Sequence, residues 1–223
     1  AAGDQAWFTG LGRVIDNNLV VDRFEGRRNG SFGPVFDPQA LLTVALGRFD
    51  AAFSACGQGE QRVQGRPPFD SARRSLQRLT RVGAARCPGE AAPAAPSPFV
   101  RWSGAWFEPD KPGRGIYLQV QDDGRAFLVW FSFRPDGEPA WIIGEGRPDG
   151  GGLIFDALAR PVGTHFGAAF DAAAVRLEHW GTARLSGDGC GSVTIDYEAA
   201  QPGYGKRRVA LTRLTAPQGA GCG

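Results

Sequence analysis

The sequence predicts an all-β protein made of two antiparallel meander units in tandem. Gly137–Cys190 aligns on Gly3–Cys56 without a gap, and 15 of these 54 positions are identical. Short apolar segments alternate with clusters of Gly, Pro, Asn and Asp, which are typical turn sequences. Each aligned stretch also ends in a cysteine with a second cysteine 31 or 32 residues further on. Because an internal period outranks chain length as a guide, the 223-residue chain is predicted to contain two units.

The second unit, residues 99–223, is predicted to be complete. We expect eight strands in it, joined by short turns such as Asp122-Asp123-Gly124 and Pro135-Asp136-Gly137. Eight sequentially paired antiparallel strands close most simply into an up-and-down barrel, which removes both sheet edges. A β-sandwich is the alternative. The expected strands are 101–107, 116–121, 125–134, 139–147, 153–158, 175–185, 192–198 and 206–215.

The first unit, residues 1–87, aligns only with the part of the second unit that follows its third strand, so it is predicted to be an N-terminally incomplete copy. Residues 71–82 could form an amphipathic helix, but the aligned segment 206–215 is rich in Val and Thr and favours a strand. Such a sheet has two unpaired edges, which need a cover. The cover could be strands from a partner chain, another copy or a cleaved fragment, or a rearranged closure within the unit. The expected strands are 5–14, 19–24, 41–50, 60–65 and 71–82.

The Ala/Pro-rich segment 88–98 between the two units has no periodic apolar face and is predicted to be a linker. No apolar run approaches the length needed to cross a membrane. The formal net charge of +2 is too small to indicate nucleic-acid binding.

The four cysteines are predicted to form one disulfide in each unit. Four cysteines allow three connectivities, and the repeat favours Cys56 with Cys87 and Cys190 with Cys222. Zinc ligation is the rival interpretation, but the chain has no C-x-x-C pair and only two histidines. Disulfides indicate an oxidising compartment, so we expect a secreted, periplasmic or cell-surface protein. The chain contains no Met, which we interpret as a processed piece of an exported protein without its signal peptide.

Residues 101–223 contain the motifs G-x-W-[FY]-x-P, a G-x-G loop, D-G-x-x-x-W, W-G, a cysteine and a closing L-x-R-L-T, and the second half of this pattern also covers 3–87. With these motifs the segment resembles a Gly/Trp-rich β repeat of exported gammaproteobacterial proteins. In the first unit Leu46-Gly47 replaces the W-G pair, so any role of that Trp is not shared. The family has no assigned activity, so the resemblance implies export and a β fold and no catalytic residue. Its main elements here are Gly104–Pro109, Gly113–Gly115, Asp136–Trp141, Trp180-Gly181 and Cys190.

No catalytic, metal or cofactor motif stands out in the sequence. His165 and His179, the only histidines, align with Ser31 and Ala45, which excludes a catalytic histidine that is repeated in both units. The Asp residues at positions such as 122, 123 and 136 lie in predicted turns, where Asp is favoured for backbone reasons. We therefore expect no catalytic residue, no metal and no cofactor.

Aromatic side chains are the better indication of a site. Phe127, Phe131 and Phe133 alternate with Leu128 and Trp130, so the two sets lie on opposite faces of one strand. One face must belong to the core, and the other could form an aromatic strip that stacks on sugars or docks a partner. The alternative is that all of these rings fill a small barrel. The candidate contact residues are Trp106, Tyr117, Trp130 and Trp141.

Together these patterns predict a non-catalytic exported β-barrel protein that acts in extracellular or cell-surface binding or assembly. The predicted partner is a protein chain, or another copy of this chain, that completes the first unit. A carbohydrate-binding module with exposed aromatics is one alternative, and a glycan or cell-wall hydrolase is a second.

Overall fold

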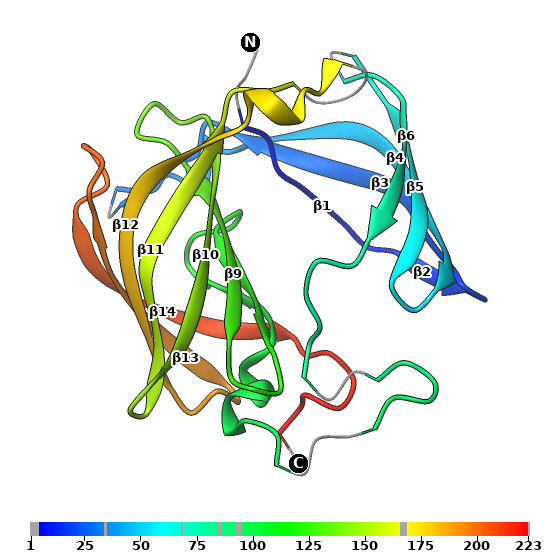
Figure 1. The fold of residues 1–223 in the computed structure, drawn as a ribbon. Coiled ribbons are helices and arrows are strands. Elements are labelled where there is room, and N and C mark those ends of the chain that lie inside the picture. Colours follow the sequence, from blue (N-terminus) through cyan, green and yellow to red (C-terminus); the bar gives the residue numbers. More distant parts are fainter. Residues whose placement is uncertain are drawn as a thin grey trace.

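In the part of the chain that the computed structural model describes, there are two antiparallel sheets and the short 3-10 helices η1 (Pro98–Trp102) and η3 (Ala172–Ala174) (Figure 1). One sheet is a closed eight-stranded barrel and the other is an open six-stranded sheet, so the all-β prediction is confirmed. The structure describes residues 5–33, 35–67, 69–83, 86–91, 95–165 and 169–222.

The barrel has up-and-down connectivity, because each strand pairs with its neighbours in the sequence and the last strand pairs with the first. This closure excludes the sandwich alternative. The strands are β7 (Gly104–Phe107), β8 (Gly115–Val120), β9 (Ala126–Phe133), β10 (Pro139–Asp149), β11 (Gly152–Val162), β12 (Arg176–Gly187), β13 (Ser192–Ala199) and β14 (Lys206–Thr215).

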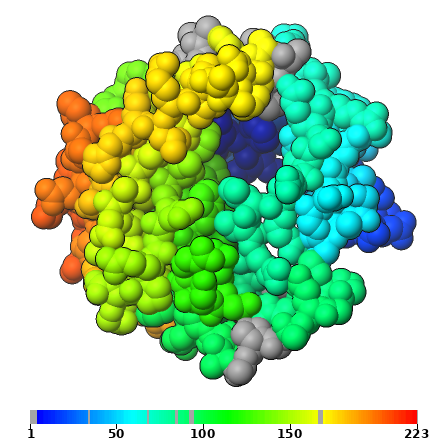
Figure 2. Space-filling model, in the orientation of Figure 1, coloured from blue at the N-terminus to red at the C-terminus, as the bar shows by residue number. Residues whose placement is uncertain are grey.

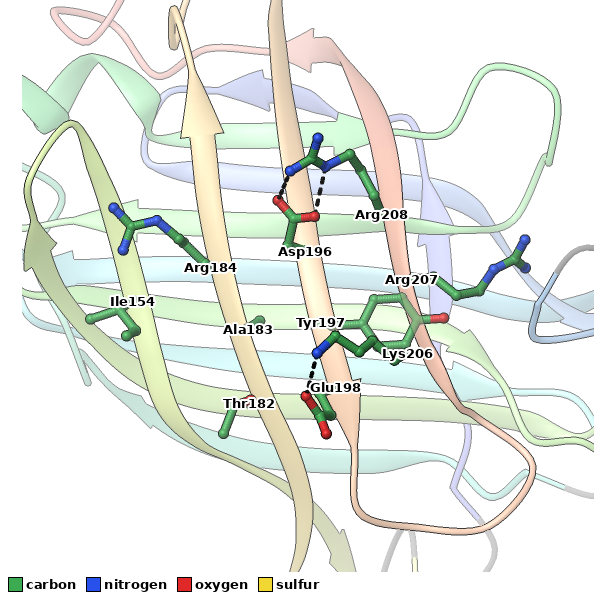
Figure 3. Close-up of a pocket in the computed structure, with 10 residues that line it drawn as sticks. All are labelled: Ile154, Thr182, Ala183, Arg184, Asp196, Tyr197, Glu198, Lys206, Arg207 and Arg208. Carbon is green, nitrogen blue, oxygen red and sulfur yellow. Dashed lines mark hydrogen bonds and ion pairs between the residues drawn. The ribbon is translucent and has the colours of Figure 1, made fainter.

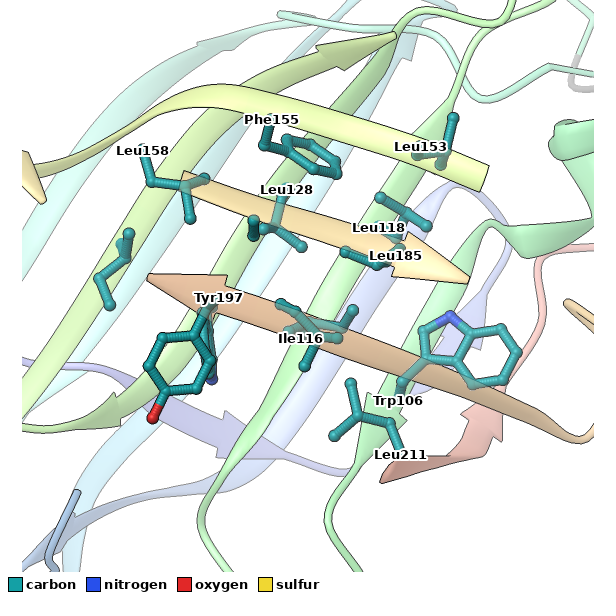
Figure 4. Packing of buried hydrophobic residues seen from close by; sticks show 14 of the residues in the cluster. Trp106, Ile116, Leu118, Leu128, Leu153, Phe155, Leu158, Leu185, Tyr197 and Leu211 are labelled. Carbon is teal, nitrogen blue, oxygen red and sulfur yellow. The ribbon is translucent and has the colours of Figure 1, made fainter. Parts of the chain in front are cut away.

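The barrel interior is a packed apolar core (Figure 4). Alternate residues of each strand point inward, as the two-residue period of a strand requires. On β9 the inward residues are Leu128 and Trp130, and the outward ones are Phe127, Val129 and Phe131. Leu118, Leu128, Leu153, Phe155 and Leu185 from four strands are fully buried. An eight-stranded barrel is just wide enough for side chains to fill it in this way.

The open sheet contains β1 (Phe8–Gly10), β2 (Arg13–Ile15), β3 (Asn18–Arg28), β4 (Leu42–Ala55), β5 (Gln58–Gly65) and β6 (Ala72–Gln77). The single strand predicted over 5–14 is thus two short pieces, both paired with β3. Segment 71–82, for which a helix was the alternative, contains the strand β6, so the strand prediction is confirmed.

One element of the barrel differs from the prediction. The strand expected over 101–107 begins only at Gly104, and the 3-10 helix η1 (Pro98–Trp102) precedes it. The reason is visible in the sequence: Pro98 begins the helix, and the side chain of Ser97 caps it by accepting from the backbone of Phe99. The helix buries Trp102 against the end of the barrel.

Each sheet contains a bulge at the same aligned position. Gly47 in β4 and Gly181 in β12 have φ values of +146° and +152°, and the strand register shifts beside both. A Cβ on Gly47 would lie 2.0 Å from the carbonyl oxygen of Gln64, and one on Gly181 would lie 2.2 Å from that of Glu198. Only glycine allows the two backbones to approach so closely.

The cysteines pair as predicted, Cys56 with Cys87 and Cys190 with Cys222, and each pair has a Cα–Cα distance of 5.7 Å. Each disulfide ties the hairpin turn after a long strand to the segment that follows the last strand of its sheet. Two such bonds fit an oxidising compartment.

The two sheets contact each other through side chains of the first unit. The Trp7 indole Nε1 donates to the carbonyl oxygen of Ser132 at 2.8 Å, and its rings pack on Phe131 and Phe133. The Gln5 side chain donates to the backbone oxygen of Trp141 at 2.7 Å and accepts from its N–H at 3.3 Å.

The predicted linker 88–98 is also in contact with the barrel. Within it, residues 92–94 lie outside the described residues, and the backbone N–H of Ser97 donates to the carbonyl oxygen of Asp122 at 2.8 Å. Just before the linker, Gly83 donates in the same way to Val120 at 2.7 Å. The segment 78–83 therefore runs beside the end of β8.

Candidate functional site

The mouth of the barrel holds an aromatic ring from the first unit. Phe32 lies among Trp130, Trp180, Tyr197 and Tyr204, with ring centroids 4.7 to 5.9 Å away. We call these four barrel residues the aromatic box. Three of the four contacts are edge-to-face, an arrangement that aromatic pairs favour. Phe32 is only 8% exposed, so it belongs to the barrel core although it lies in a loop of the other sheet.

Cationic side chains surround the chain just after Phe32. Arg114 is 5% exposed; its Nη1 donates to the carbonyl oxygen of Gly33 at 3.1 Å, and its Cζ lies 5.4 Å from the centroid of the Phe32 ring. Arg207 approaches from β14, because a Cβ placed on Gly33 would lie 3.7 Å from its Nη1. Glu108 is the nearest counter-charge, 3.3 Å from Nη2 of Arg114.

Burial changes the acidity of the two box tyrosines. It raises the pKa of Tyr197 to about 12, although the positive charges of Arg207 and Arg114 act in the opposite direction. Burial also raises the pKa of Tyr204. Both phenols are therefore neutral at physiological pH. The hydroxyl of Tyr197 donates to the backbone oxygen of Tyr204 at 3.4 Å.

We expect Tyr197 to ionise near pH 12 in the folded protein, against about 10 in the unfolded chain. Between these pH values only the unfolded state gains from ionisation. The free energy of unfolding therefore keeps its full value below pH 10 and falls by roughly 2 to 3 kcal/mol as the pH rises to 12. Absorbance at 295 nm and urea unfolding at several alkaline pH values measure the two effects. In Tyr197→Phe this part of the titration should disappear, and a Tyr197 that ionises near pH 10 in the folded protein would contradict the expectation.

The open sheet exposes positions whose aligned counterparts are buried in the barrel. Phe8 of β1 is 37% exposed, whereas the aligned Ile142 of β10 is 0% exposed. Leu19 is half-buried and the aligned Leu153 is fully buried. In the barrel the strands β7, β8 and β9 complete the enclosure of these positions. The described part of the first unit has no strand in that place.

Two edges of the open sheet are unpaired among the described residues. β1 and β2 pair only with β3, and β6 pairs only with β5. In Figure 1, β1 and β2 lie at one end of the curved sheet and β6 lies at the other. Figure 2 shows the hollow that this sheet leaves open beside the barrel. The buried core of the sheet is correspondingly small and consists of Val21, Phe24, Leu46 and Val63.

The four aromatic residues predicted as contacts do not form one surface. Trp106 and Trp130 are 1% and 3% exposed and lie inside the barrel, so they are core residues. Tyr117 and Trp141 are half-buried on the outer face. Of the other rings considered, Phe133 is fully buried and Phe131 packs on Trp7. The first unit therefore covers part of the expected aromatic strip.

A depression of about 560 Å³ lies on the outer face of β11 to β14 (Figure 3). Four of its charged groups form two ion pairs, Arg208 with Asp196 at 2.7 Å and Lys206 with Glu198 at 2.9 Å. Of its other arginines, Arg184 pairs with Asp149 outside the depression, and Arg207 makes no ion pair with a described residue. Such exposed ion pairs contribute little to stability and leave few charges free for a ligand. We assign no function to this depression.

Four of the described carboxyl groups have lowered pKa values. A general acid at neutral pH needs a raised pKa. Hydrogen bonds from Arg73, Arg125 and Arg134 instead lower the pKa values of Glu60, Asp123 and Asp136, respectively, and backbone N–H donors led by that of Cys190 lower the pKa of Asp188. These shifts belong to turns and ion pairs.

The histidines and other possible ligands are dispersed. His165 lies in the loop after β11, and His179 is exposed on β12. In the part of the chain that the structure describes, no group of three or more His, Cys, Asp and Glu residues could hold a metal ion. No helix within the described ranges is long and apolar enough to span a bilayer.

Sequence reasoning did not predict the three main residues of the barrel mouth, which are Phe32, Arg114 and Arg207. Phe32-Gly33 recurs in the sequence as Phe166-Gly167, which lie outside the described residues, so a signal existed. It indicates a shared loop and does not say which surface the ring meets. In the sequence, Arg114 is the middle residue of the G-x-G loop and Arg207 lies in the predicted strand 206–215, and neither pattern indicates a buried cationic site.

The fold and these sites define a two-sheet β protein. It consists of a closed barrel filled with aromatic side chains and an open sheet that contacts the barrel at its mouth, and each of the two units contains one disulfide. A scan against protein-family models gave no match. Searches of curated proteins and of solved structures gave none either.

Proposed function

We propose that this chain is a non-catalytic exported protein that acts by binding or assembly, and that its open sheet takes up strands from another polypeptide. The observation that carries the proposal is that, among the described residues, β1 and β2 pair with no strand other than β3, and β6 pairs with no strand other than β5. Unpaired edges present rows of free N–H and C=O groups that readily accept a further strand.

The barrel strands that have no counterpart in residues 3–87 support strand uptake. The alignment matches β10 to β14 with the strands of the open sheet, so the segment without a counterpart is the meander β7 to β9. Its inward side chains, such as Leu118 and Leu128, are fully buried in the barrel. A partner of this kind would cover Phe8 and Leu19 and would pair both edges.

Export is supported by the two disulfides, which persist in oxidising compartments and are rare in reducing ones. The carbohydrate-binding alternative retains only Tyr117 and Trp141 of its four aromatic residues on an outer face. The hydrolase alternative gains no support, because the shifted carboxyl groups have lowered pKa values. Binding through the open sheet therefore has the stronger structural basis.

We expect that a second copy of residues 101–136, fused directly before Gly3, will close the open sheet. The alignment specifies this junction, because Gly137 follows residue 136 and aligns with Gly3. Closure should raise the Tm of the first unit by at least about 5 °C, since a further kcal/mol shifts a domain of this size by several degrees. Hydrogen exchange should slow at the amides of β1 and β6.

The separate segment 101–136 should bind the unfused chain and should not bind the fused one, which native mass spectrometry can measure. A matched control carries Asp in place of Leu118 and Leu128 in the added copy only, because inward charges prevent closure. If the fused chain shows the same exchange at β1 and β6 as the unfused chain, the sheet does not accept these strands and the proposal fails.

A further inference from the structure

The barrel mouth has the properties of a ligand site that is filled from within the chain. Its occupant, Phe32, comes from a loop between β3 and β4, and the four rings around it come from the barrel. Ligand sites in barrels commonly lie at the mouth. We propose that the aromatic box, together with Arg114 and Arg207, is a binding site for an aryl carboxylate, and that Phe32 occupies it in place of this ligand.

The aryl part of the ligand follows from the box. Phe32 makes edge-to-face contacts with Trp180, Tyr197 and Tyr204, and its ring is nearly enclosed. Removal of a benzyl side chain from such an enclosure leaves a ring-sized apolar space, and cavities of this kind bind benzene-like molecules.

The carboxylate part follows from the two arginines. Arg114, just before β8, donates to the carbonyl oxygen of Gly33, and Arg207 of β14 lies beside the same residue. A carboxylate attached where the Phe32 backbone continues into Gly33 would thus lie beside two guanidinium groups. Arg–carboxylate hydrogen bonds are stronger than those to a neutral peptide carbonyl. The site fits a carboxyl-terminal phenylalanine or a small aryl acid with the same spacing.

The charge balance of the mouth favours an anion. Glu108 is shared between Arg114 and Lys111, so one carboxylate faces two cations. Arg207 makes no ion pair with any residue in the described ranges. An anionic ligand would supply the counter-charge that the protein itself does not.

Three buried polar atoms at the mouth also have no hydrogen-bond partner among the described residues. They are Nε of Arg114, Nε1 of Trp180 and the hydroxyl of Tyr204, and all three residues are at least nine-tenths buried. A buried donor without a partner is unfavourable and marks a position where a polar ligand atom is missing. The Phe32 ring lies beside Arg114 and Trp180 and has no oxygen or nitrogen atom that could accept a hydrogen bond. A ligand with oxygen atoms could satisfy donors that Phe32 leaves unpaired.

The experiment uses the full chain with Phe32→Ala and two probes. One is the peptide acetyl-Asn-Gly-Ser-Phe with a free carboxylate, which has the sequence of residues 29–32, and the other is 3-phenylpropionate. Calorimetry should detect binding to Phe32→Ala and at least tenfold weaker binding to the unmodified chain, because there Phe32 competes. The amide form of the peptide should bind at least tenfold more weakly than the acid.

The arginine variants test the carboxylate contact. In the Phe32→Ala background, Arg207→Gln should remove the preference for acid over amide. Arg208→Gln is the matched control: Arg208 is the next residue and points outward to Asp196, so the preference should remain. If 3-phenylpropionate binds as tightly as the peptide, the ligand class is a small aryl acid. If only the peptide binds, it is a carboxyl-terminal phenylalanine.

Near-UV circular dichroism shows whether the variants keep the packed barrel. If Phe32→Ala does not fold, the same measurements are made on Phe32→Leu, which leaves a smaller cavity. Equal binding of acid and amide, or no binding of either probe by a folded variant, would overturn the proposal. Neither result depends on strand uptake by the open sheet, so this site can fail or succeed independently of the proposed function.

Discussion

Replacement of Arg213 by alanine is expected to lower the free energy of unfolding of the barrel by on the order of 3 to 5 kcal/mol. Arg213 donates to the backbone oxygens of Arg101 at 2.6 Å, Ser103 at 3.1 Å and Cys190 at 2.6 Å, and also to that of Gly189. Its Cζ lies 4.2 Å from the centroid of the Trp106 ring. Hydrogen bonds from a charged donor are each worth more than neutral ones, and their loss leaves several carbonyls unpaired.

The position of Arg213 explains the size of this effect. β14 pairs with β7 at the seam where the end of the barrel meets its beginning, and Arg213 joins η1, β7 and the Cys190 turn across that seam. Lysine has three donors on a single nitrogen and cannot reproduce this fork. Arg213→Lys should therefore recover only part of the loss.

Arg78 is the matched control for Arg213, because it aligns with it in the first unit. Arg78 is exposed, and its side-chain hydrogen bonds go to the sulfur atoms of Cys56 and Cys87. Arg78→Ala should cost less than about 1 kcal/mol. Urea unfolding followed by tryptophan fluorescence measures both variants. Equal losses for the two would show that Arg213 does not hold the seam.

Replacement of Gly181 by alanine should destabilise the barrel by about 3 to 5 kcal/mol. Its φ of +152° is unfavourable for other residues, and the added Cβ would lie 2.2 Å from the carbonyl oxygen of Glu198. That oxygen belongs to the paired backbone of β13 and cannot retreat without loss of the β12–β13 register. Chemical denaturation of the purified variant gives the free energy directly.

Two further alanine variants complete this test. Gly151→Ala adds a Cβ with no atom within 4 Å and should change stability by less than about 0.5 kcal/mol. Gly47→Ala should disrupt the open sheet, since its Cβ would lie 2.0 Å from the oxygen of Gln64. Hydrogen exchange can separate the two sheets. A Gly181→Ala protein as stable as Gly151→Ala would show that the bulge at Gly181 tolerates a side chain.

Much of the architecture was predictable because it depends on local patterns. The hairpin turns, the two-residue alternation and the cysteine spacing each involve neighbouring residues or an aligned pair of segments. These patterns predicted the eight strands of the barrel and both disulfides. The helix η1 was missed because a single Ser-Pro at positions 97 and 98 precedes a segment with strong strand character.

The candidate sites were less predictable. Alternation on β9 showed that Trp130 and Phe131 lie on opposite faces but could not say which face is inside. Closure of the barrel decided that, and it turned two of the four predicted contact residues into core. The docking of Trp7 on Phe131 and Phe133 then covered part of the outer face. None of these outcomes is a property of one strand.

The sequence by itself determined the number and order of the barrel strands and the cysteine pairing. Tertiary structure alone decided that Phe32 fills the aromatic box, that Arg114 and Arg207 meet beside Gly33, and that Arg213 holds the barrel seam. The physical reason is the range of the interactions. Periodicity and turn preferences act over a few residues, whereas Gly33 and Arg114 are 81 residues apart, and only the closed barrel and the docked sheet bring them together.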